Sequence, residues 1–188
     1  RLDGSWDAEV RFSAPLPAPR ALHARIIAPN GAVAARVDAR AEGATAALAG
    51  RRLERVLAWD LEFPTMYRLD VTVDGPVPEQ RAVVFAFRTF EDSGDGFLLN
   101  GRPLFVRAEW DDFVFPGWGR TVPSAWALRH RLRTAKELGF NAVVCGGMVP
   151  DARVPLLADR LGLLLWYELP APSVFTPRAA AHLDAMLA

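Results

Sequence analysis

Two short runs in the second half of the chain gather carboxylates and aromatic side chains. Residues 109–112 read EWDD, and residues 166–168 read WYE. Carboxylates serve enzymes as general acids, general bases and nucleophiles, and aromatic rings with a few polar neighbours are typical of ligand sites. A structural interpretation stands beside this one, because aspartates after a strand commonly form turns and tryptophans are commonly buried. Both interpretations depend on how the fold positions the two runs.

The remaining reactive residue types offer no second chemistry. The single cysteine, Cys145, excludes an internal disulfide, and no cationic neighbour in the sequence would activate its thiol. We therefore expect Cys145 to be a small buried hydrophobe. The three histidines, His23, His130 and His182, lie far apart in the sequence and form no metal-binding motif. We expect neither a metal nor a cofactor.

The overall composition argues against two classes of partner. Twenty-two basic residues balance twenty-two acidic ones, so no net field attracts this surface to nucleic acid or to anionic lipid. No apolar run reaches the roughly 20 residues that span a bilayer, and the first ten residues contain neither an initiator methionine nor a signal-peptide pattern. We therefore expect an excised piece of a longer protein, with no membrane contact, and assign it no compartment.

Helices and strands in the second half of the chain must position these two runs. The residue pattern of that half predicts them, because helix signals and strand signals alternate along it. Capping residues and glycine stops bound the helices, and continuous apolar runs indicate buried parallel strands. The predicted elements are a helix capped by Ser124 and ended by Gly139, a strand at 140–145, a helix at 155–161 ended by Gly162, a strand at 163–166, and a final helix opened by Thr176 and Pro177.

This alternation predicts a parallel α/β unit, which belongs either to a doubly wound sheet or to an eight-stranded barrel. The phosphate-binding signature GxGxxG that often marks the doubly wound sheet is absent, because no third glycine follows Gly146 and Gly147 at the needed spacing. We therefore favour the start of a barrel over residues 92–188. In both architectures the residues that build a site lie at the carboxyl ends of the strands, which is where 109–112 and 166–168 fall.

The first half of the chain has a period of two, which predicts strands with one face buried. Turn residues at 29–31 and at 74–76 separate pairs of such strands and predict hairpins. Short strands at this spacing, without a helical stretch, predict an antiparallel immunoglobulin-like sandwich over residues 1–91. A further compact hairpin follows at residues 96–110, with its turn at Asn100 and Gly101.

Four phrases resemble, in order and spacing, one enzyme family: FAFRTFE, FLLNGRPLFVRAEW, AKELGFNAVV and LADRLGLLLWYELP. They are similar to the junction and early barrel of glycoside hydrolase family 2, which contains β-galactosidases, β-glucuronidases and β-mannosidases. In that family an immunoglobulin-like sandwich precedes the barrel, and LAWDLEFPTMYRLDVTV resembles its penultimate strands. The resemblance covers the whole chain and is strongest over residues 85–170.

The resemblance implies where sugar would bind. Trp110 matches a residue that lines the sugar subsite in the family, and Asp111, Trp166 and Glu168 are the further substrate-binding candidates. The β-mannosidase pattern fits slightly best, since Gly146 and Gly147 resemble the glycine run of that group. One departure stands out: Val143 and Val144 occupy the place of an arginine that usually helps to hold the nucleophile.

The resemblance also implies that the catalytic carboxylates lie elsewhere, on the fourth and seventh barrel strands, which this chain does not reach. We expect an exo-acting retaining glycoside hydrolase for terminal β-mannosides or β-galactosides, with this chain alone inactive. Two other classes stay open: a non-catalytic carbohydrate-binding or scaffold protein with a degenerate glycosidase architecture, and an adhesive sandwich module joined to an unrelated α/β domain. Because an incomplete barrel would expose its apolar inner face, we also expect self-association.

Overall fold

A computed structural model describes residues 2–50, 52–168 and 176–181 of the chain. The chain forms two compact units, residues 1–104 and 105–188. The predicted start of the second unit at residue 92 lies earlier, because Phe90–Asp92 pairs with the hairpin that follows it. That pairing keeps residues 92–104 with the first unit.

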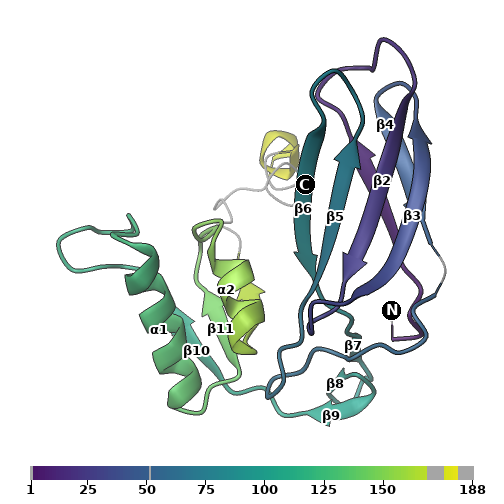
Figure 1. The fold of residues 1–188 in the computed structure, drawn as a ribbon. Helices are drawn as coiled ribbons and strands as arrows, with labels where there is room; N and C mark the ends of the chain where they lie inside the picture. The colour runs from purple at the N-terminus through teal and green to yellow at the C-terminus, as the bar shows by residue number, and fades with distance from the viewer. Residues whose placement is uncertain (1, 51, 169–175, 182–188) are drawn as a thin grey trace. The chain divides into compact units, whose positions relative to one another are not determined.

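The first unit is an antiparallel β-sandwich (Figure 1). One sheet has the order β3-β2-β5-β6 and the other pairs β1 with β4. Alternate residues of β2 and β5 are buried, among them Leu22, Ile26 and Leu69, and they pack against Leu48 of β4. The expected sandwich is thus confirmed. The strands are β1 (Asp7–Arg11), β2 (Arg20–Ile27), β3 (Val33–Ala41), β4 (Thr45–Ala49), β5 (Tyr67–Val73) and β6 (Glu79–Phe85).

A small three-stranded antiparallel sheet completes the first unit. It consists of β7 (Phe90–Asp92), β8 (Phe97–Leu99) and β9 (Arg102–Leu104). Asn100 and Gly101 form the two-residue turn between β8 and β9, with φ values of 53° and 74°. Two consecutive positive φ values are the requirement of a type I′ turn, which Asn-Gly meets at low cost. The hairpin predicted at this dipeptide is confirmed.

The second unit contains a parallel sheet of the order β10-β11-β12, formed by Ala108–Asp111, Ala142–Cys145 and Leu164–Tyr167. Helices α1 (Ala125–Glu137) and α2 (Val154–Leu161) connect the strands. Both helices pack on one face of the sheet, where their apolar residues share a core with alternate strand residues. That core includes Leu128, Leu132, Ala135, Val143, Cys145, Val154, Ala158 and Leu163.

The helix ends lie where the sequence predicts them. The hydroxyl of Ser124 accepts a hydrogen bond from the backbone N–H of Ala127, and Gly139 follows α1 with φ 91°. Gly162 ends α2 in the left-handed conformation. Residues 177–181 are helical, and Thr176 caps them through a hydrogen bond from the N–H of Ala179; the predicted continuation of this helix to the chain end lies outside the described residues. The alternation of strand and helix is confirmed, and closure into a barrel stays a prediction.

Candidate sugar-binding face

The face of the parallel sheet that the helices leave uncovered carries two tryptophans. The parallel register aligns Trp110 of β10 with Val144 of β11 and Trp166 of β12. Their neighbours Asp111, Cys145 and Leu165 point to the helix-covered side, and successive strand residues point to opposite faces. Trp110, Val144 and Trp166 therefore form one row on the other face, which we call the open face.

Both indoles of this row are accessible. Trp110 is 58% exposed and Trp166 is 54% exposed. Because neighbouring strands lie about 4.8 Å apart, the Cα atoms of the two tryptophans are separated by about 10 Å, with Val144 between them. Glu168 is exposed directly beyond β12, and its N–H donates to the carbonyl of Cys145. Trp110, Trp166 and Glu168 thus lie toward the carboxyl ends of their strands, and their contact with a sugar stays a prediction.

Asp111 lies on the opposite side of the sheet from the two tryptophans. Its carboxylate is 4% exposed and accepts hydrogen bonds from the backbone N–H of Phe113, at 2.6 Å, and from Arg131 Nε. Arg131 also donates to the carbonyl of Val114. Both carboxylate oxygens are therefore engaged within the unit, which argues against the predicted contact between Asp111 and a ligand. The turn-forming interpretation of this aspartate is the one the geometry supports.

The carboxylates of the first run therefore do not converge on the open face. Glu109 shares the helix-covered side with Asp111, and burial, followed by the charge of Asp111, raises the pKa of Glu109 above its ordinary value. Asp112 accepts a hydrogen bond from the indole N–H of Trp110 at 2.9 Å. Within the described residues, the two runs thus supply no pair of free carboxyl groups on one face, which retaining hydrolysis would need at a separation of about 5 Å.

Cys145 takes no part in this site. Cys145 is fully buried, and burial, with a smaller effect of the Asp111 charge, raises the pKa of its thiol to about 11. The thiolate needed for nucleophilic chemistry is therefore scarce at neutral pH. In the part of the chain that the structure describes, no three His, Cys, Asp or Glu side chains could together hold a metal ion, and no helix is long and apolar enough to cross a membrane.

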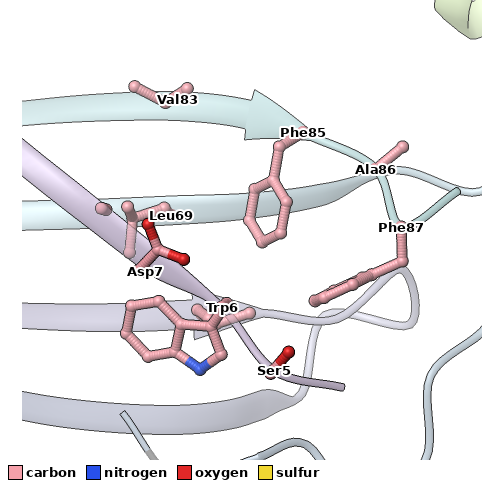
Figure 2. Close-up of a pocket in the computed structure, with 10 residues that line it drawn as sticks. Ser5, Trp6, Asp7, Leu69, Val83, Phe85, Ala86 and Phe87 are labelled. Atoms are coloured by element: carbon pink, nitrogen blue, oxygen red, sulfur yellow. The ribbon is translucent and has the colours of Figure 1, made fainter. Parts of the chain in front are cut away.

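A hollow of about 310 Å³ lies in the sandwich between β1 and β6. Figure 2 shows the indole of Trp6 facing the rings of Phe85 and Phe87 across it. Its lining is mostly apolar, with Ser5 and Asp7 as the polar contributors. Nothing in this lining resembles an acid–base pair, and we assign it no chemistry.

Three features of the second unit were not predicted from the sequence. They are the pairing of Asp111 with Arg131, the stacking of Trp126 on His130 along α1, and the contact of the Trp110 ring with Gly146. The strand period alone would have shown that adjacent residues such as Trp110 and Asp111 point to opposite faces. The stacking of Trp126 on His130 could have been read from their spacing of four residues in a predicted helix. The other two features depend on contacts between distant segments and leave no local signal.

Comparison with known proteins finds relatives of this chain by sequence. No protein-family model matches the chain. A protein of Formosa agariphila provisionally named a beta-glucuronidase is 32% identical over 132 residues, which are 67% of this chain and 16% of that protein. Beta-galactosidase 2 of Enterobacter cloacae is 32% identical over 114 residues, 59% of this chain and 11% of that enzyme.

A solved structure extends the similarity to both units. The crystal structure of Bacteroides uniformis beta-glucuronidase superposes with a TM-score of 0.82 and 25% identity, covering 96% of this chain and 23% of that one. The chain therefore corresponds to less than a quarter of the length of each of these proteins.

Proposed function

Since the chain belongs to glycoside hydrolase family 2, we propose that the whole protein hydrolyses terminal β-linked sugars with retention of configuration. The open face of the sheet β10-β11-β12 would form one wall of the sugar site. The observation that carries this proposal is the alignment of Trp110, Val144 and Trp166 in one row, with Glu168 beyond the last strand.

The row suits a pyranose ring for a physical reason. The C–H groups of a sugar form an apolar patch that packs on an aromatic ring, while its hydroxyl groups require polar partners. Trp110 and Trp166 offer the ring faces, and Glu168 offers a charged acceptor for hydroxyl hydrogens, which makes a stronger bond than a neutral acceptor. These residues would bind and orient the sugar, and the acid and the nucleophile would come from other strands of the whole protein.

The identity of the sugar is part of the proposal. The relatives named above are β-glucuronidases and β-galactosidases, so a β-glucuronide joins the β-mannoside and the β-galactoside expected from the sequence. A glucuronide carries a carboxylate, which Glu168 would repel at close range. On this ground we favour a neutral sugar, a β-galactoside or a β-mannoside.

The test is hydrolysis of aryl β-D-galactoside, β-D-mannoside and β-D-glucuronide by the whole protein, with the aryl α-galactoside as the control. We expect turnover of a neutral β-glycoside, a first-formed product of β configuration by NMR, and no turnover by residues 1–188 alone. Hydrolysis by residues 1–188 alone, or inversion of configuration, would refute the proposal.

One observation favours a second candidate. Val143 and Val144 occupy the place where an arginine usually helps to hold the family's nucleophile, and a valine can offer no such hydrogen bond. A non-catalytic carbohydrate-binding protein would tolerate this change. Calorimetric binding of the free sugars by the whole protein, without turnover of any aryl glycoside, would select this candidate over the hydrolase.

A further inference from the structure

The indole of Trp110 is held in place although more than half of it is exposed. Its Nε1–H donates to Asp112 Oδ1 at 2.9 Å. Its ring also lies against the backbone of Gly146, the residue that follows β11: a Cβ on Gly146 would come within 2.3 Å of two ring carbons and 2.5 Å of Nε1. The Asp112 side chain thus holds the indole N–H, and the absence of a side chain at Gly146 leaves room for the neighbouring ring atoms.

These two contacts come from different parts of the chain, Asp112 after β10 and Gly146 after β11. The hydrogen bond to Asp112 specifies where the N–H edge points, because such bonds weaken steeply when they are bent. The contact with Gly146 specifies how deep the ring lies against the neighbouring strand end. An exposed tryptophan without such contacts would exchange among staggered rotamers, and ordering it on binding would lower the affinity for a ligand.

We propose that Asp112 is a positioning residue that, with Gly146, presets Trp110 as the platform for the sugar ring. This inference rests on the proposed function, since it assumes that Trp110 contacts sugar. The role belongs to the acceptor oxygen of Asp112 and not to its charge. An asparagine retains that oxygen, whereas an alanine removes it.

The experiment uses the whole protein with 5-fluorotryptophan in place of tryptophan. Trp110→Phe identifies the fluorine resonance of Trp110, and the kinetics of the fastest aryl β-glycoside give KM and kcat for Asp112→Ala, Asp112→Asn, Gly146→Ala and Trp110→Ala. Phe63→Ala is the control, because it removes an exposed aromatic ring from the segment between β4 and β5 of the first unit.

We expect Asp112→Ala and Gly146→Ala each to raise KM about tenfold with little change in kcat, as loss of uniform binding does. Both should also move the Trp110 resonance toward that of an exposed, mobile ring. Asp112→Asn and Phe63→Ala should keep the wild-type KM and the wild-type Trp110 resonance. Thermal unfolding of each variant separates these effects from loss of the fold.

Three results would overturn the inference, and they are distinguishable. An Asp112→Asn protein as impaired as Asp112→Ala would show that Asp112 acts through its charge. An unchanged KM in Asp112→Ala, together with a raised KM in Trp110→Ala, would leave the sugar contact intact and remove the positioning role. An unchanged KM in Trp110→Ala would refute the sugar contact itself, and the inference with it.

Discussion

At the scale of single residues, Asp111 shows how a candidate binding group becomes a structural one. Its carboxylate is buried beside Arg131, whose guanidinium also lies 5.1 Å from the ring centre of Phe115. A buried carboxylate requires a partner, because an unpaired charge of low exposure is costly. Arg131 and the N–H of Phe113 meet that requirement and tie the end of β10 to α1.

Replacing Asp111 tests this structural role. Asp111→Ala leaves Arg131 and the N–H of Phe113 without their acceptor, so we expect the free energy of unfolding of the second unit to fall by about 2 kcal/mol. The value is below that of a fully buried pair because the Arg131 side chain is 34% exposed. Urea denaturation of residues 1–188 measures it, with the exposed loop residue Asp95 changed to Asn as the control. An Asp111→Ala protein as stable as the Asp95→Asn control would contradict this account.

At the scale of elements, His23 links three strands of the sandwich on its outer surface. Its Nδ1 lies 2.7 Å from Asp38 of β3, and its Nε2 lies 3.4 Å from Asp74, which follows β5. The hydrogen bond with Asp38, and then that with Asp74, raise the pKa of His23 above its ordinary value of 6.5. The protonated imidazole can donate to both carboxylates, whereas the neutral ring can donate to one.

The pH dependence of the sandwich follows from the sign of this shift. A raised pKa means that the folded state holds the proton more tightly, so the stabilisation is complete below pH 6.5 and is lost as the pH rises through the folded-state pKa. We expect the melting temperature of the first unit to fall more between pH 6 and about pH 8 in the wild type than in His23→Gln. Equal slopes in calorimetric scans of the two proteins would refute the three-strand link.

The strands, turns and helix caps also show which parts of the fold can be predicted from the sequence. The Asn100-Gly101 hairpin and the Ser124 cap were predicted because each depends on the conformation of a few adjacent residues. Strand β4 was not predicted, since Thr45–Ala49 is rich in alanine, which has little preference for strands. Pairing with β1 and burial of Leu48 hold it in place. The side of the sheet that Asp111 would take was likewise not predicted, because it is decided by packing against α1.

At the scale of the whole molecule, the open face of the second unit is the feature that needs an explanation. It displays two tryptophans that are each more than half exposed, and these are costly groups to leave in water without a role. In the proposed hydrolase the same face becomes a wall of a sugar site. The self-association expected of this face stays a prediction, since it concerns residues 1–188 without the remainder of the protein.

The most direct test of this account is a crystal structure of the whole protein with the free monosaccharide released from its best aryl glycoside. The account predicts a pyranose ring in van der Waals contact, within about 4.5 Å, with the indoles of both Trp110 and Trp166. A sugar bound away from both indoles, or a protein segment covering the open face, would contradict it.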